Sequence, residues 1–558
     1  MNYIWMNLSE LLRPLHQRIF TNRFPWLPRV AHEIFVLSTL YWWVQTIAQQ
    51  NRYPGGDGPH ILGTAGRLAQ LLREGEFEWF VYCFSSLLGP HPPFAYLPFM
   101  GSAFFFPQLD YNHLIGGAFV IWLIADALYR LNVGLIGFLL LWVWTPIWLQ
   151  TENAGIDLIA GATVIQSISH LVRSNRLEDR YHTIAWGAWI GVAFMTKYTA
   201  PMFLWAPCLV AGIWALKHRR LYRVAQGIGG FAVVALPWWS THWKQVQGYV
   251  LASGNAQSGL LTNKTIIEDS WTIENMLWYP TAMMDTIGVW LPYFFVVGLL
   301  MAQIHFKDKV KNWTGLVLLS SVLGGWLMLN GQKQRQDRYI IPAYPVLTAG
   351  LSMAPAWSIL LASPMIWNVT KANWTLYTDD NMAPSQRSYT HDVTKPALTY
   401  PLPHEAYWPI SHQLDPWKID DALEKIARIQ GDSGTVGFLL DEQGGAPGYG
   451  IVLSKTVRLD LKWHIATIMI ARPNGPGPKD PNRPLASIFV GPFLFGEWPS
   501  RDFDIMLSMV KHDDQQREKW LQSTKMVVVE EWPLPMDRVG RIYVKPDLVE
   551  QYESLVPQ

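Results

Sequence analysis

The sequence is poor in cysteine and in charged residues, and both shortages narrow what the chain can be. Its two cysteines, Cys83 and Cys208, lie in different settings and give no disulfide or metal framework. Charged residues make up 16% of the 558 positions and the formal net charge is +1, so no basic field indicates nucleic acid as a partner. No internal repeat is evident, which disfavours transporters built from inverted repeats.

Hydrophobic residues, in contrast, are abundant. They make up 50% of the chain, which also contains 30 tryptophans, and this composition predicts a polytopic α-helical membrane protein rather than a soluble enzyme. Windows of about 20 apolar residues predict the membrane spans. They are residues 30–49, 112–129, 131–149, 154–172, 183–197, 199–216, 224–243, 281–304, 313–329 and 339–363.

Basic residues gather in alternate loops and set the orientation of these spans. They are Arg13, Arg18, Arg23, Arg29, Arg130, Arg173, Arg176, Arg180, Lys217, Arg219, Arg220, Arg223, Lys307, Lys309 and Lys311. The positive-inside rule places these loops, together with the N-terminal residues 1–29, in the cytoplasm. Two long loops with few basic residues for their length, 51–111 and 241–280, therefore face away from the cytoplasm.

The first outer loop, residues 51–111, is too long for a simple connection, and loops of this length are usually functional. It begins with a Gly-Gly-Asp-Gly-Pro turn that presents the carboxylate of Asp57. Apolar residues at helical spacing then run from Ile61 to Leu72 and predict an amphipathic helix that lies in the membrane interface. Further along the loop, His91 precedes two prolines in a rigid turn.

The outer loop between the ninth and tenth spans is unusual because it is basic. It reads NGQKQRQDRYIIPAYP and carries Lys333, Arg335 and Arg338. Two interpretations remain open: these side chains reach water from a helix end, or they bind a phosphate or pyrophosphate, for which arginine offers a two-pronged donor set. Asp157 and Lys197 lie at the outer ends of the fourth and fifth spans. Either residue by itself could be a charged group at a span end that reaches water. Their position at the same outer face of the membrane favours a functional cluster.

Together, and in this order, the motifs resemble those of the C-type glycosyltransferases. The motifs are the acid of the first outer loop, His-Pro-Pro, an Asp at the outer end of a middle span, Thr-Lys, Leu-Pro-Trp-Trp (236–239) and Arg-Tyr-x-x-Pro-x-x-Pro. More narrowly, the chain is similar to dolichyl-phosphate-mannose protein mannosyltransferases and lipid A aminoarabinose transferases. The resemblance covers about residues 25–360 and implies a C-type transmembrane glycosyltransferase bundle of ten or eleven spans at residues 30–363.

The resemblance implies a role for each matching residue. Asp57 matches the acid that acts as general base or orients the acceptor, and Asp157 matches a second active-site acid. Relatives often carry Asp-Glu where this chain has Asp57 followed by glycine, which leaves Glu152 as another candidate carboxylate. The residues expected to bind the donor phosphate or its lipid carrier are His91, Lys197, Lys333, Arg335, Arg338 and Tyr339. In many relatives a lysine stands where this chain has His91.

We therefore expect an inverting glycosyltransferase that moves a sugar from a polyprenyl-phosphate donor to a hydroxyl of a protein or glycolipid, on the extracytoplasmic face of the plasma (inner) membrane. Asp57 would accept the proton of the hydroxyl, and the basic residues would stabilise the departing phosphate. The sequence indicates no cofactor and no compact ligand set for a divalent metal. The alternative is a transporter or flippase, in which the same residues bind an anionic lipid-linked substrate without chemistry. The sugar and the acceptor remain open.

Beyond residue 363 the composition changes. Residues 364–414 are rich in Pro, Asp, Asn and Thr and predict a linker, and residues 415–558 predict a soluble α/β domain. A helix begins this domain, TVGFLLDE, ASIFVG and KMVVVEEW predict buried strands, and GRIYVKP predicts an edge strand. The domain contains no phosphate-binding loop and no nucleophile elbow. Ten spans place it in the cytoplasm, whereas an eleventh would place it outside, as in relatives with such a tail.

Overall fold

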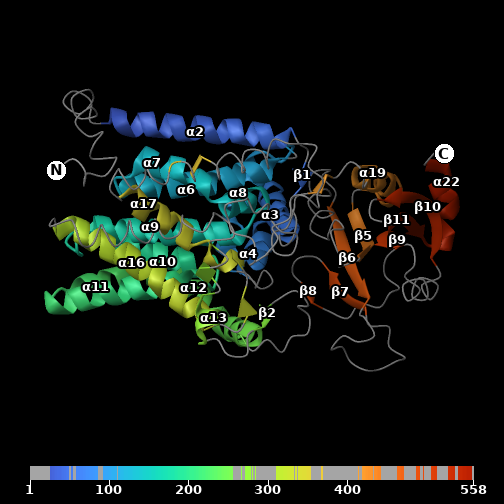
Figure 1. Ribbon diagram of the computed structural model, residues 1–558. Helices are drawn as coiled ribbons and strands as arrows, with labels where there is room; N and C mark the ends of the chain where they lie inside the picture. The colour runs from blue at the N-terminus through green and yellow to red at the C-terminus, as the bar shows by residue number, and fades with distance from the viewer. Residues whose placement is uncertain are drawn as a thin grey trace. The chain divides into compact units, whose positions relative to one another are not determined.

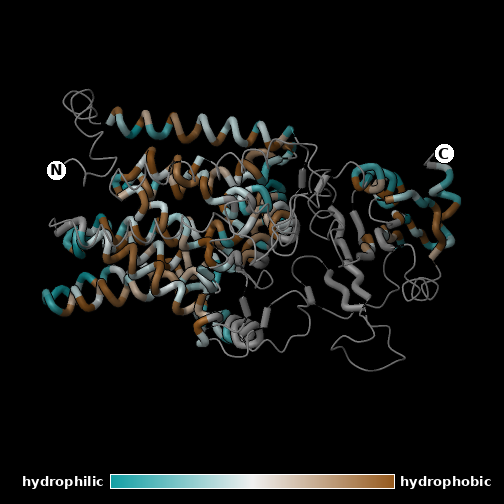
Figure 2. The backbone as a smooth tube through the Cα atoms, in the orientation of Figure 1, coloured by the Kyte–Doolittle hydropathy of each residue, from teal (hydrophilic) through white to brown (hydrophobic). Residues whose placement is uncertain are grey.

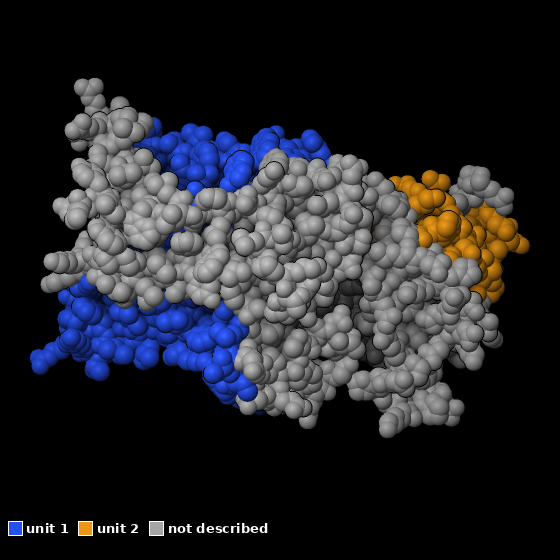
Figure 3. Space-filling view, in the orientation of Figure 1, with its two compact units in different colours: residues 1–49, 117–257, 263–410 blue, residues 50–116, 258–262, 411–558 orange. Residues whose placement is uncertain are grey.

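The chain forms two compact units in the computed structural model, which are coloured separately in Figure 3. Unit 1 comprises residues 1–49, 117–257 and 263–410, and unit 2 comprises residues 50–116, 258–262 and 411–558. The structure describes residues 26–49, 52–53, 58–85, 92–109, 111–254, 265–266, 271–277, 279–280, 283, 309–331, 334–335, 337–353, 363, 366–367, 412–413, 418–431, 433–440, 462–470, 486–490, 494–495, 504–511, 526–534 and 538–555.

Unit 1 is a bundle of helices that run side by side (Figure 1). Its longer helices are α2 (Leu27–Ala48), α6 (Asn112–Arg130, whose first turn belongs to unit 2), α9 (Ile156–Arg173), α10 (Arg180–Phe194), α11 (Trp205–Lys217), α12 (Leu221–Gly254) and α16 (Lys309–Asn330). Shorter elements connect them: α7 (Gly134–Leu140), η4 (Leu141–Val143), α8 (Thr145–Glu152), η5 (Ala200–Phe203), α13 (Ile273–Met276), η6 (Asp337–Ile340) and α17 (Ala343–Ser352). Strands β2 (Thr265–Ile266) and β3 (Gln334–Arg335) pair with each other.

Hydrophobic residues recur along these helices, where brown stretches alternate with paler and teal ones in Figure 2. Within the described residues, two helical segments are long and apolar enough to cross a membrane alone, Asn112–Arg130 and Asn312–Asn330. The segments Gly134–Val143 and Pro146–Glu152, bent by 89°, make a third if they form one broken span. Helices also lie within the other expected spans, except that residues 281–304 lie almost wholly outside the described residues, as do residues 354–362 of the last span. Helices α10 and α11 are too short to cross a membrane alone, whereas α2 and α9 are long enough but contain polar residues, such as Glu33 and Gln166, that lower their hydropathy.

Small residues allow α10 and α12 to pack closely and in parallel. Gly187 of α10 lies against the backbone of Gly227 of α12, and Gly230 of α12 lies against the backbone of Ile184. A Cβ atom at Gly187 or Gly230 would collide with the backbone of the other helix. Packing through small residues is a common way for helices to associate in a membrane, where no hydrophobic force drives them together.

The first-loop part of unit 2 contains three helices. They are α3 (Gly58–Arg73), α4 (Phe77–Ser85) and α5 (Leu97–Phe105), with η3 (Pro93–Ala95) before the last of them. The predicted amphipathic helix is therefore present as α3. Its apolar side, which includes Ile61 and Leu68, is buried and packs against α5, so that protein rather than lipid covers that side.

The rest of unit 2 is a seven-stranded mixed sheet in the order β10-β11-β9-β5-β6-β7-β8. Its strands are β5 (Ser433–Leu440), β6 (Lys462–Ile470), β7 (Ala486–Val490), β8 (Leu494–Phe495), β9 (Ile505–Lys511), β10 (Val527–Leu534) and β11 (Arg538–Val544). Helices α19 (Ile419–Gln430) and α22 (Val549–Leu555), with η9 (Pro546–Leu548), complete it, and β1 (Arg52–Tyr53) pairs with β4 (His412–Gln413). Strands are present at the three expected positions as β5, β7 and β10. The expectation that KMVVVEEW forms a buried strand is wrong, because β10 lies at the edge of the sheet and Val527 and Val528 are exposed. The expectation that GRIYVKP forms an edge is wrong, because β11 lies between β10 and β9.

Candidate functional site

Asp157 lies in the first turn of α9 and is almost completely buried, with 1% of its surface exposed. The first turn of a helix carries unpaired backbone N–H groups and the positive end of the helix dipole, which stabilise a carboxylate there. Gly155 precedes this turn as the N-cap, and the structure shows no side-chain cap at that position.

Lys197 supplies the opposite charge. It follows the end of α10 at Phe194, where the negative end of a helix dipole favours a cation. Its Nζ lies 2.5 Å from Oδ1 of Asp157, and only 9% of the residue is exposed. A buried ion pair persists only when both charges are well compensated, because the loss of hydration costs several kcal/mol per ion.

Tyr339 completes this constellation from η6. The Nζ of Lys197 lies 5.1 Å from the centre of the Tyr339 ring, within the range of a cation–π contact. The Arg-Tyr-x-x-Pro-x-x-Pro motif reaches this position because it packs on α9. One turn beyond Asp157, Gly161 has no side chain and faces Ile341, Pro342 and Pro345. We call the end of unit 1 where α9 begins and α10 ends the Asp157 end.

The structure thus brings together three of the residues predicted from separate motifs, Asp157, Lys197 and Tyr339. Of the others, Asp57, His91 and Lys333 lie outside the described residues. Arg335 lies in β3, where its backbone pairs with Thr265 of the second large loop, and Arg338 lies in η6 next to Tyr339. Glu152, the other candidate carboxylate, is buried in α8.

Aromatic residues that the sequence did not single out as site residues adjoin Lys197. The ring of Tyr198 lies 6.2 Å from that of Trp239 on α12, in an edge-to-face arrangement. Phe194 contacts the same indole at 5.8 Å. The Leu-Pro-Trp-Trp motif was the available signal, since it puts two indoles directly after Pro237, the proline inside α12.

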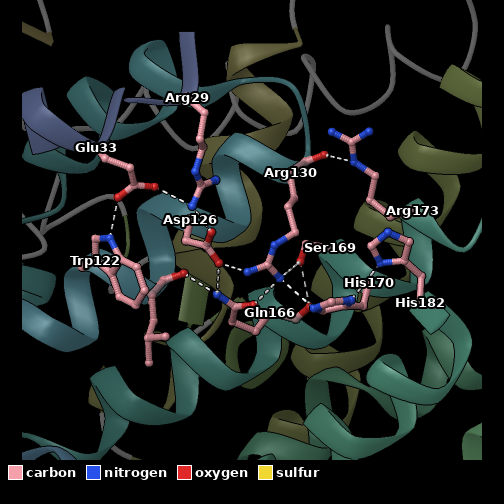
Figure 4. A network of polar contacts seen from close by, with 11 residues as sticks. Arg29, Glu33, Trp122, Asp126, Arg130, Gln166, Ser169, His170, Arg173 and His182 are labelled. Atoms are coloured by element: carbon pink, nitrogen blue, oxygen red, sulfur yellow. Dashed lines mark hydrogen bonds and ion pairs between the residues drawn. The ribbon is translucent and has the colours of Figure 1, made fainter. Parts of the chain in front are cut away.

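A second polar cluster lies at the opposite end of the same bundle (Figure 4). It centres on Asp126 of α6, which pairs with Arg29 of α2 and with Arg130 one turn further along α6. Nη1 of Arg130 lies 2.6 Å from Oε1 of Gln166 and 2.7 Å from Nε2 of His170, both on α9. We call this the Arg130 end.

The Arg130 end also joins α9 to α10 and to the loop after α6. Nδ1 of His170 lies 3.0 Å from Nδ1 of His182 on α10. Arg173 donates through Nε to the backbone carbonyl of Arg130 and through Nη2 to Oδ1 of Asn132. The sequence predicted Arg130 and Arg173 only as cytoplasmic positive charge, and it did not single out His170 or His182.

The described residues contain no group of three or more His, Cys, Asp and Glu side chains placed to hold a metal ion. The Asp157 end offers a carboxylate, an ammonium and adjacent aromatic rings. A fixed ammonium beside the basic β3–η6 segment is suited to bind an anion at a membrane interface.

No protein-family model and no curated protein sequence matches the chain. Among solved structures it is similar to ArnT from Cupriavidus metallidurans bound to undecaprenyl phosphate, with a TM-score of 0.56 over 91% of this chain and 97% of that chain. The chain has the fold of ArnT. The apo structure of ArnT gives a TM-score of 0.52 over the same shares, and the sequence identity is 12% in both comparisons.

Because ArnT is a C-type glycosyltransferase, the resemblance drawn from the sequence motifs is confirmed at the level of the fold. The shared ArnT fold and the apolar helices also identify the chain as a membrane protein. The comparison covers nearly all of both chains, so it includes the helical bundle and the C-terminal sheet.

Proposed function

We propose that this chain is an inverting glycosyltransferase that moves a sugar from a polyprenyl-phosphate donor to a hydroxyl of a protein or glycolipid. The observation that carries the proposal is the buried constellation of Asp157, Lys197 and Tyr339. It occurs in a chain with the fold of a protein that was crystallised with undecaprenyl phosphate.

The reaction needs a proton acceptor and a stabilised leaving group. The acceptor oxygen attacks the anomeric carbon, its proton passes to Asp57, and the bond from that carbon to the phosphate oxygen breaks with its electron pair on the phosphate. A well-placed base contributes roughly a hundredfold to ten-thousandfold. Lys197 stabilises the phosphate, and Asp157 and Tyr339 hold the ammonium in position.

The remaining predicted residues extend the anion site. Lys333, Arg335 and Arg338 come from the β3–η6 segment, which leads directly to Tyr339, and His91 comes from the first outer loop. A guanidinium forms two parallel hydrogen bonds to a phosphate, whereas the Lys197 ammonium acts as a point charge.

The position of the constellation suits an amphiphilic donor. Its polyprenyl tail stays in the bilayer, while the phosphate and sugar lie at the interface. Asp157 and Lys197 lie at helix ends, opposite the Arg-rich Arg130 end that the positive-inside rule assigns to the cytoplasm. We therefore propose that the reaction takes place on the extracytoplasmic face.

The test is sugar transfer in proteoliposomes supplied with radiolabelled polyprenyl-phosphate sugars and candidate acceptors. The parent is compared with Asp57→Asn, Lys197→Gln and the control Lys217→Gln, which changes an exposed lysine at the end of α11. We expect the first two variants to lose transfer and the control to keep it. Movement of intact donor across the bilayer without cleavage would instead identify a flippase. Equal transfer by all variants would contradict the roles proposed for Asp57 and Lys197.

A further inference from the structure

Helices α9 and α10 pack along their length, and a contact between polar side chains lies near each end of the pair. At the Asp157 end, the carboxylate of Asp157 meets the ammonium of Lys197 at 2.5 Å. At the Arg130 end, Nδ1 of His170 meets Nδ1 of His182 at 3.0 Å (Figure 4). The two contacts are about 20 Å apart along α9, at the usual rise per residue of an α-helix.

The proton positions at the histidine contact follow from Arg130. A guanidinium has only donors, so Nε2 of His170, 2.7 Å from Nη1 of Arg130, must carry a lone pair. Neutral His170 then carries its proton on Nδ1 and donates it to Nδ1 of His182, which must also be unprotonated. One arrangement therefore satisfies all three side chains, and in it both imidazoles are neutral.

A proton added to His170 breaks this arrangement. It places an N–H on Nε2 against the N–H groups of Arg130, so that two cations face each other. A proton added to Nδ1 of His182 likewise puts two donors face to face. His182 precedes the expected span 183–197, and burial lowers its pKa below that of an ordinary histidine. The contact therefore breaks when the pH on that side of the membrane falls below the usual histidine range.

The charged and titratable groups around the pair come from three helices. Arg130 reaches His170 from α6, and Tyr181 contacts it from α10 at 6.3 Å between ring centres. Arg173 of α9 and Asp179, the N-cap of α10, lie near His182. From α16, the uncharged indole of Trp313 reaches the carbonyl of Leu171.

Helix α9 is able to carry a displacement from one end to the other. Every residue from Ile156 to Leu171 is buried, and the helix contacts α8, α10, α16 and α17. Closely packed helices shift as units rather than bend locally, because interiors are packed as densely as crystals. A change in how α9 sits on α10 at His170 is therefore felt at Asp157.

We propose that His170 and His182 are positioning residues for the Asp157–Lys197 pair, and that their neutral contact, fixed to α6 by Arg130, sets how α9 lies along α10. The proposal rests on the proposed transferase function, because its consequence is a dependence of transfer on the pH at the Arg130 side. Neither histidine touches the reacting groups.

The experiment uses the full chain in proteoliposomes with a single orientation. The pH on the Arg130 side is lowered from about 7.5 to about 4.5, below the usual histidine range because the pKa of His182 is lowered by burial, while the pH on the Asp157 side is held constant. We expect transfer by the parent to fall about tenfold, as a loss of kcat with little change in KM, since misplacement of a reacting group by less than 1 Å has effects of this order.

Three variants separate positioning from other effects. His182→Asn keeps an acceptor near Nδ1 but does not titrate, so its transfer should stay high at both pH values. His182→Ala should be slow at both. His218→Asn changes an exposed histidine after the end of α11 and should respond to pH as the parent does. Thermal unfolding of each variant checks that it folds.

The proposal is overturned if the parent does not respond to pH on the Arg130 side, or if His182→Asn responds as the parent does. A second readout does not need activity: histidine 15N NMR of the protein in nanodiscs should show His170 protonated on Nδ1 and unprotonated on Nε2 at neutral pH. The other tautomer, or a protonated His170, rejects the positioning role even if transfer is observed. The correct tautomer without transfer by the parent rejects the transferase function instead.

Discussion

The buried charged side chains at the two ends of α9 are stabilised in different ways. At the Arg130 end, Asp126 is shared by two arginines and by the amide of Gln166, and each arginine forms further contacts. At the Asp157 end, the carboxylate of Asp157 meets the ammonium of Lys197 beside the ring of Tyr339. Arginine holds several partners in a fixed geometry, whereas the lysine ammonium is a compact charge on a flexible stem. The first end is suited to hold helices together, and the second to redirect a charge toward a substrate.

Among the variants that test this difference between the two ends, we expect the largest effect from Lys197→Met. It leaves Asp157 buried without its counter-charge, so we expect a loss of roughly 3 to 5 kcal/mol in stability. We also expect transfer to fall at least about a hundredfold, because a cation that stabilises the leaving phosphate is gone. Thermal unfolding in detergent and transfer in proteoliposomes measure the two effects.

The double variant Asp157→Leu with Lys197→Met separates stability from chemistry. With both charges removed, the unfolding temperature should return toward that of the parent, because an apolar pair often replaces a buried ion pair without loss. Transfer should stay low. Recovery of both properties would show that the pair is only structural.

Asp126→Asn tests the other end. It leaves Arg29 and Arg130 beside a neutral amide, and we expect a loss of about 3 kcal/mol in stability. Transfer per folded molecule should fall by less than about tenfold, because no reacting group is touched. The matched control is Glu178→Gln, whose carboxylate is exposed and pairs with Arg220, and which should cost less than about 1 kcal/mol. A hundredfold loss of transfer in Asp126→Asn at normal stability would contradict the division of roles between the two ends.

Gly187→Ala acts between the two ends. The new methyl group meets the backbone of Gly227, so α10 must move away from α12, at a cost of about 1 to 3 kcal/mol in stability. Gly212→Ala on α11 is the matched control, because nothing lies within 4 Å of the added methyl group. Unfolding temperatures of the two variants measure the difference. If both behave alike, the close packing of α10 on α12 is not what holds these helices.

The sequence predicted the residues of the Asp157 end because polar residues stand out where they interrupt or end an apolar run. Asp157 and Lys197 stood at the ends of predicted spans, and Tyr339 belonged to a motif, so their common face could be inferred before any contact was known. Their direct contact could not, because it depends on how α9 packs against α10 and on Gly161, which allows the η6–α17 segment to approach α9.

The Arg130 end was missed for a physical reason. Arg130 and Arg173 satisfied the positive-inside rule as loop residues, so nothing required them to be paired. The signal was Asp126, an acid inside an apolar span and four residues before Arg130, which a helix places on the same side. The position of β11 was missed similarly: strand order depends on long-range pairing, and a short run of alternating residues does not encode it.

The variant with the smallest expected effect tests what Tyr339 contributes at the Asp157 end. Tyr339→Leu removes the ring over which the Lys197 ammonium lies, a contact that contributes roughly 0.5 to 2 kcal/mol. The ammonium should then be held less firmly, and KM for the donor should rise about threefold to thirtyfold with the fold intact. Tyr339→Phe keeps the aromatic face and is the control: it should match the parent if the ring acts through its π-system. An equal loss in Tyr339→Phe would show that the phenol hydroxyl, rather than the ring, is what Tyr339 contributes.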